Sequence, residues 1–166
     1  MENLLEVLEK EDTEYQSLIL LGKEKKDILV KGDIPALEKI TVREQDVSSV
    51  LRNLEIRREK IMDDMSIVLN KPKNELTIVN MIEILSKRPE EQARLQELRA
   101  RLKDTLAEMA KVNDQNQRLT KQALELVEYD LTLFKSMRQA PETANYNRNA
   151  YNTGEILGTT GFDAKQ

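Results

Sequence analysis

The sequence predicts an all-α fold: an elongated antiparallel helical hairpin and a long third helix, arranged as a coiled-coil-like three-helix bundle, followed by a flexible C-terminal tail. Three observations favour this fold. Apolar residues recur at alternating steps of three and four over most of the chain, which is the period of a helix packed along one face. Hydrophobic residues make up 39% of the sequence and charged residues 34%, a balance typical of long helices with narrow apolar faces. Only five glycines and four prolines are present among 166 residues.

The first helix is expected over residues 2–31. Its apolar row runs through Leu4, Leu8, Glu11, Tyr15, Leu18, Gly22, Lys25 and Leu29. Gly22 within this row costs about 1 kcal/mol relative to alanine, and we interpret it as tolerated there rather than as a point of close helix approach. The next residues, Lys31-Gly32-Asp33-Ile34-Pro35, predict a tight turn. Gly32 can close one helix, while Asp33 caps the next and Pro35 fits its first turn. A connection this short requires an antiparallel hairpin.

The second helix is expected over residues 34–70, with an apolar row through Leu37, Ile40, Glu44, Val47, Leu51, Leu54, Arg58, Ile61, Met65 and Val68. Counting back through the hairpin brings Arg58 near Glu11, so we expect a Glu11–Arg58 pair whose role is to set the register. A shorter helix is expected over residues 75–87, with Leu76, Val79, Ile82 and Leu85 on one face.

The third long helix is expected over residues 89–138, where no glycine or proline follows Pro89. Pro89 suits a first helical turn. The apolar row runs through Leu95, Leu98, Leu102, Thr105, Met109, Val112, Asn116, Leu119, Ala123, Leu126, Asp130, Leu133 and Met137. From Leu119 onwards a second row joins it, made of Leu124, Val127, Leu131 and Phe134. One row serves one neighbour, so two rows predict a further binding partner.

Helix lengths indicate that this double-rowed end is left uncovered. At about 1.5 Å per residue, a third helix that runs back from Pro89 meets the tip of the hairpin at about residue 126. If residues 75–87 stack into the same rod, the tip lies nearer residue 110. In either arrangement the apolar end must be buried by a second copy, by the tail or by another protein.

Residues 139–166 are predicted to form a flexible tail, which leaves 1–138 as the bundle. This segment holds three of the five glycines and no helical or strand period. Five of the six aromatic residues lie at or after residue 129. Aromatic side chains dominate interface energetics, so this clustering favours a contact surface, the alternative being that they seal the end of the bundle.

Composition excludes several classes of function. The sequence has no His and no Cys, no glycine-rich phosphate loop and no nucleophile paired with a base, so we expect no catalytic residues, no cofactor and no metal site. The net charge of −4 argues against nucleic acid as a partner. The longest apolar run, Leu18–Leu21, is too short for membrane insertion, and the N-terminus is unlike a signal peptide. We therefore expect a cytoplasmic binding protein that is not an enzyme.

Short motifs, in a fixed order over residues 4–137, carry a family resemblance. They are Leu8-x-x-Glu11-x-x-x-Tyr15-x-x-Leu18, then Lys25 to Leu29 followed by Lys31-Gly32-Asp33, then Leu37, Glu44-Gln45, Leu54-Glu55 with Arg58, and Asn113-x-x-Asn116-x-x-Leu119. In this order the chain resembles the FlgN family of flagellar export chaperones.

The resemblance implies a cytoplasmic helical chaperone that binds the C-terminal amphipathic segments of hook-filament junction proteins, the hook-associated proteins. Such a chaperone keeps these clients unassembled and delivers them to the export gate of the flagellar type III export apparatus. Family members also carry a tail tyrosine followed shortly by glycine, which is implicated in docking on the gate. Tyr151, three residues before Gly154, is the nearest match, and Tyr146 is a second candidate.

The residues themselves predict where a client would bind. We expect a helix-in-groove site centred on Leu119, Ala123, Leu126, Val127, Leu131 and Phe134. Asn113 and Asn116 lie at the expected entrance, and equally they fit polar positions that set the register of a bundle. The alternative function is a homo-oligomeric coiled-coil adaptor with no export role, in which the two apolar rows form a homodimer.

Overall fold

In the computed structural model of the protein, residues 1–139 are described, and they are all-α as predicted. The elements are α1 (Glu2–Lys31), α2 (Ile34–Leu69), the 3-10 turn η1 (Lys73–Glu75), α3 (Ile78–Ile84), the 3-10 turn η2 (Leu85–Lys87) and α4 (Pro89–Gln139). No strand occurs within residues 1–139. Of the predicted tail, residues 139–166, Gln139 is the last residue of α4. Residues 140–166, with Tyr146 and Tyr151, lie outside the described residues.

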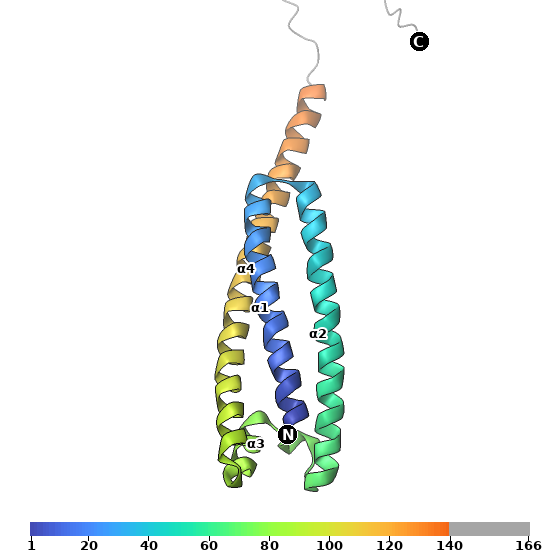
Figure 1. Cartoon of the computed structure of the whole chain (residues 1–166). Coiled ribbons are helices and arrows are strands. Elements are labelled where there is room, and N and C mark those ends of the chain that lie inside the picture. The colour runs from blue at the N-terminus through green and yellow to red at the C-terminus, as the bar shows by residue number, and fades with distance from the viewer. Residues whose placement is uncertain (140–166) are drawn as a thin grey trace, which may run out of the picture. The chain divides into compact units, whose positions relative to one another are not determined.

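The chain divides into two compact units, Met1–Glu128 and the residues from Tyr129 onwards. The first unit holds α1, α2, α3 and the first 40 residues of α4 (89–128). In this unit α1 and α4 run in the same direction, α2 runs back antiparallel to α1, and the short α3 lies at the base beside the N-terminus (Figure 1). The fold is therefore a hairpin with a third helix laid along it.

The turn between α1 and α2 forms as the sequence predicts. Gly32 adopts the left-handed conformation with φ of 67°, and its N–H donates to the carbonyl of Leu29. Asp33 then caps α2, because its Oδ1 accepts a hydrogen bond from the N–H of Ala36 at 3.0 Å. Pro35 occupies the first turn of α2. These local contacts satisfy helix-end groups and fix the antiparallel hairpin.

The predicted single helix over residues 75–87 is wrong. The segment contains only the seven-residue α3 between two 3-10 turns. Thr77 starts α3, because its Oγ1 accepts from the N–H of Asn80 at 3.2 Å. Leu76 is already buried ahead of this cap, Met81 is buried within the helix, and Val79 faces solvent. Packing against the bundle selects this face, which an apolar period over so few residues does not determine.

The main apolar cluster lies at the base of the first unit. It joins residues of α1, the α3–η2 segment and α4, namely Leu4, Leu5, Leu8, Met81, Leu85, Leu95, Leu98 and Leu102. The α2 helix contributes only partly buried side chains to it, and Ile40 is the one residue of α2 that is fully buried. Val68, predicted in the apolar row of α2, is 83% exposed, and Leu69 lies half-buried beside it. Most of the fully buried side chains therefore come from α1, α4 and the α3–η2 segment rather than from α2.

Polar contacts fix the register of the three helices. The predicted pair between α1 and α2 is confirmed, since Arg58 Nε donates to Glu11 Oε1 at 2.9 Å. Asp12 ties α1 to α4: its carboxylate accepts from Thr105 Oγ1 at 2.8 Å and from Arg101 Nε at 2.8 Å. Tyr15 lies beside Glu11 and Arg58. Burial is the main cause that raises the pKa of its phenol, and the negative charge of Glu11 raises this pKa further. Contacts of this kind specify one alignment, because any slip of a helix would leave a buried charge without a partner.

Candidate functional site

The hairpin covers α4 only up to a definite point. Asn116 Nδ2 of α4 donates to the backbone carbonyl of Gly22 of α1 at 2.7 Å. The two residues are 94 positions apart, so Gly32, at the hairpin tip, falls level with about residue 126 (32 + 94). Of the two alignments that the sequence allows, the structure has the one in which residues 75–87 do not extend the rod.

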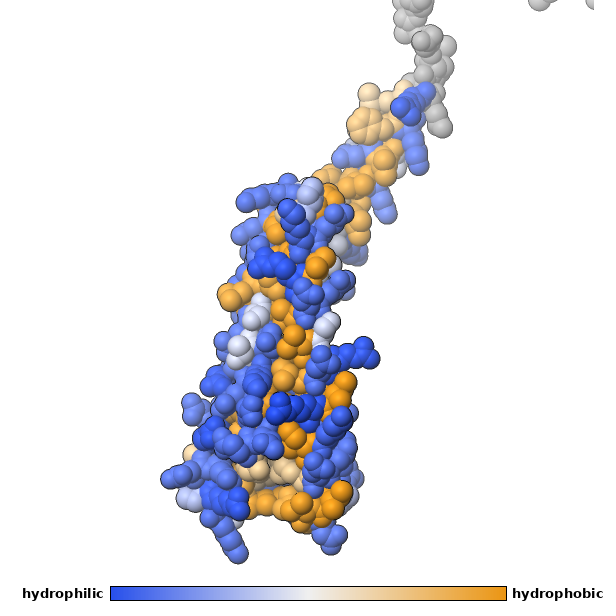
Figure 2. All heavy atoms as spheres, turned by 45° about the vertical axis from the view of Figure 1, so that its right-hand side comes forward, coloured by the Kyte–Doolittle hydropathy of each residue, from blue (hydrophilic) through white to orange (hydrophobic). Residues whose placement is uncertain are grey.

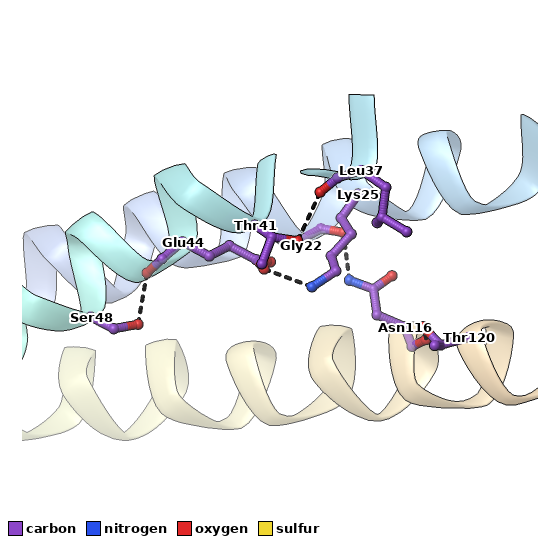
Figure 3. A network of polar contacts seen from close by, with 8 residues as sticks. All are labelled: Gly22, Lys25, Leu37, Thr41, Glu44, Ser48, Asn116 and Thr120. Atoms are coloured by element: carbon purple, nitrogen blue, oxygen red, sulfur yellow. Dashed lines mark hydrogen bonds and ion pairs between the residues drawn. The ribbon is translucent and has the colours of Figure 1, made fainter. Parts of the chain in front are cut away.

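Gly22 lies at a close approach of α1 and α4, so its interpretation as a merely tolerated glycine is wrong. A Cβ atom added at Gly22 would lie 2.6 Å from Val112 Cγ1, well inside van der Waals contact. Figure 3 shows Asn116 reaching from α4 to the Gly22 carbonyl, beside the ion pair between Lys25 and Glu44, whose Nζ and Oε2 are 2.6 Å apart. Glycine allows this contact because it has no side chain.

The two asparagines of the predicted site lie in different environments. Asn116 is buried in the α1–α4 contact, and its Oδ1 has no hydrogen-bond partner among the residues that the structure describes. Asn113 is exposed and lines, together with Asn116, a pocket of about 290 Å³ between the three long helices. Asn116 is therefore a buried polar position of the α1–α4 contact, whereas Asn113 is open to solvent.

Beyond Asn116, α4 loses its cover within the first unit. Leu119 and Ala123 are half-buried. Leu126 and Val127 are more than half exposed, with Leu126 at 62%. Leu124, of the second predicted row, is equally exposed. These side chains carry the apolar surface that the two rows predict, and in the described part of the chain it faces water.

The described residues of the second unit continue α4 and carry the same character. Leu131 and Phe134, both in the predicted site, are 53% and 63% exposed. Tyr129, Leu133 and Met137 are also exposed. Each unit therefore presents large apolar side chains on helical backbone, which is the type of surface that protein partners bind.

The charges on this part of α4 are solvated and mixed in sign. Arg118 pairs with Asp114 at 2.8 Å and Lys121 with Glu125 at 3.9 Å, both across one helical turn and both exposed. Pairs of this kind contribute only a few tenths of a kcal/mol each. The apolar side chains, rather than a concentrated charge, distinguish the surface.

No group of three or more acidic side chains within residues 1–139 could hold a metal ion. No described helix is long and apolar enough to cross a membrane.

Comparison with known proteins identifies the family. The model of a family described as FlgN protein matches residues 1–154, which is most of the chain. No curated protein and no solved structure matches the chain. FlgN proteins serve flagellar protein export as chaperones and generally bind hook-associated proteins. The matched region spans the hairpin, the Gly22–Asn116 contact and the exposed half of α4. The chain therefore belongs to the FlgN family of flagellar export chaperones.

Proposed function

We propose that the exposed C-terminal half of α4 binds the C-terminal amphipathic segment of a hook-associated protein in the cytoplasm, keeps it unassembled and delivers it to the export gate. One observation carries the proposal: α4 exposes Leu124, Leu126 and Val127 in the first unit, and Leu131 and Phe134 in the second. An exposed apolar face on a preformed helix is suited to bind the apolar face of an amphipathic client helix.

The energetics suit reversible binding. Each leucine-sized side chain that leaves water contributes about 1.5–3 kcal/mol at full burial. Five or six such side chains, already half-buried or exposed on preformed helix, offset the cost of association and give an affinity of about micromolar. Ordering the client segment on binding costs part of the interaction free energy. This cost keeps the affinity low enough for release at the gate.

The export-gate step of the proposal falls to the tail. Tyr151, followed by Gly154, matches the family's tail pattern most nearly, and Tyr146 is the second candidate. Their proposed role is to dock the loaded chaperone on the export apparatus, with the client held on α4.

The double variant Leu126→Asp/Leu131→Asp tests the client site. Each change places a charge where the client's apolar face would lie, so we expect binding to the C-terminal segment of a hook-associated protein to weaken at least about 100-fold. Isothermal titration calorimetry measures the affinity. Circular dichroism checks that helicity is kept, as expected for two exposed positions.

A matched control places the same charges elsewhere on exposed apolar positions. Leu20→Asp/Val42→Asp changes one residue of α1 and one of α2, both more than half exposed. This variant is expected to bind the segment with wild-type affinity. Wild-type binding by a helical Leu126→Asp/Leu131→Asp protein would show that the client site lies elsewhere.

Self-association through the same surface is the alternative use. Light scattering at two protein concentrations separates the two functions. A chaperone with an open surface is expected to have a monomer mass that is unchanged by tenfold dilution. A stable dimer that Leu126→Asp/Leu131→Asp converts to monomer would favour the adaptor instead.

A further inference from the structure

A second apolar recess lies at the base of the first unit, where α1 begins and α2 ends. We call it the basal cleft, and it has a volume of about 530 Å³. Its apolar lining comes mainly from α2 and α3: Ile61, Met65, Val68, Leu69, Met81 and Ile84. Figure 2 shows hydrophobic side chains gathered at this end of the bundle. A cleft of this size accommodates a few leucine-sized side chains.

The basal cleft has a firm floor and an open rim. Met81 and Leu85 lie at the floor and are 1% and 5% exposed. Val68 on the rim is 83% exposed. Met65 stands half-buried between them. Methionine adapts to irregular apolar partners because it is unbranched and polarisable. A recess with a packed floor and apolar rim in water is suited to hold an inserted side chain.

Charges at the rim favour an acidic partner. Two basic residues, Lys87 and Arg88, line the cleft against one acid, Asp64, in a chain whose net charge is −4. No ion pair joins Lys87 to another described residue, and the pair of Arg88 with Glu91, at 3.3 Å, is exposed and weak. A carboxylate from a ligand can therefore reach both cations without breaking a buried contact.

We propose that the basal cleft docks an acidic amphipathic helix of a second protein. Its apolar side chains enter between α2 and α3, and its carboxylates lie against Lys87 and Arg88. The cleft uses no residue of the α4 surface, so the proposal stands apart from client binding and allows two partners at once. A second copy docked cleft to cleft would bring four of these cations to one small contact, which disfavours self-association here.

Methionine methyl NMR with a defined probe tests the inference. The probe is a synthetic amphipathic peptide of about 20 residues, above the length at which an isolated helix is marginal in water, with leucine on one face and glutamate on the other. A second peptide carries lysine in place of glutamate. We expect the glutamate peptide to shift the methyl signals of Met65 and Met81, and the lysine peptide to bind at least tenfold more weakly.

Two neighbouring residues give a matched pair of variants. Val68→Glu adds a negative charge to the rim and is expected to weaken binding of the glutamate peptide at least tenfold. Ile67 is 79% exposed and does not line the cleft, so Ile67→Glu is expected to leave the affinity for the glutamate peptide unchanged. Both positions are exposed, so neither change removes buried packing. Lys87→Glu/Arg88→Glu should reproduce the loss.

Met137 separates this inference from the client proposal, because it lies on the exposed part of α4. Shifts confined to Met137 would show that the peptide binds α4 only, which overturns the basal site and leaves the client site intact. Equal affinity for both peptides would overturn the acidic partner. Light scattering could also show a dimer of the wild type that Val68→Glu dissociates. That result would overturn the acidic partner and make a second copy the occupant of the basal cleft.

Discussion

The double variant Arg101→Met/Thr105→Val is expected to destabilise the fold by about 3 kcal/mol, because it leaves a buried carboxylate without its partners on α4. The Asp12 side chain is only 3% exposed. In the wild type its Oδ1 accepts from Thr105, and its Oδ2 accepts from Arg101 and from Gln16 of its own helix. After the change Gln16 alone remains. Chemical denaturation followed by circular dichroism measures the loss.

Two further variants make this test specific. Adding Asp12→Leu to the double variant removes the orphaned charge, so stability should return to within about 1 kcal/mol of the wild type. Arg118→Met breaks an exposed pair on the same helix, and about 0.5 kcal/mol is the largest change expected. A double variant as stable as the wild type would show that Asp12 is not held by its α4 partners.

Gly22→Ala is expected to destabilise the protein by about 2 kcal/mol, although alanine is the better helix former by about 1 kcal/mol. The new methyl group would lie 2.6 Å from Val112 Cγ1, and a β-branched side chain has little room to turn away. Separating the helices also stretches the bond from Asn116 to the Gly22 carbonyl and leaves a buried amide unsatisfied. Thermal and denaturant unfolding measure the effect.

Rescue distinguishes this clash from a general glycine effect. Val112→Ala removes the clashing atom, so adding it to Gly22→Ala should recover most of the loss. Gly32→Ala serves as the control, because Gly32 has φ of 67° and no atom within 4 Å of an added Cβ. It should cost about 1 kcal/mol through backbone strain, and Val112→Ala should not rescue it. A Gly22→Ala protein more stable than the wild type would mean that the α1–α4 spacing is not tight.

Local signals predicted the long helices well. The segment from Gly32 to Pro35 carries a helix stop, a cap and a helix start, each acting within a few residues, and α1 and α2 end and begin there. The segment around α3 was predicted poorly for the opposite reason. Its Thr77 cap is a local signal, but the face that α3 buries depends on leucines of α1 and α4 that lie far away in sequence.

The candidate site shows the same division. The exposure of Leu126, Leu131 and Phe134 follows from helix period and helix length, both legible in the sequence. The role of Gly22 does not, because its partner Asn116 comes 94 residues later and only the assembled register brings them together. The basal cleft could not be predicted from the sequence either, because its lining residues come from three separate segments: α1, α2 and α3–η2.

The parallel course of α1 and α4 has a consequence for synthesis on the ribosome. The α1–α2 hairpin closes over a two-residue turn, whereas the contacts of Asp12 and Gly22 with α4 span 93 and 94 residues. Short-range contacts form first because little chain entropy opposes them. At about 5–20 residues per second, the nascent hairpin waits several seconds for α4. Until then Leu4 and Leu8 lack the α4 leucines that complete their cluster. During that interval this chaperone is itself an aggregation-prone chain.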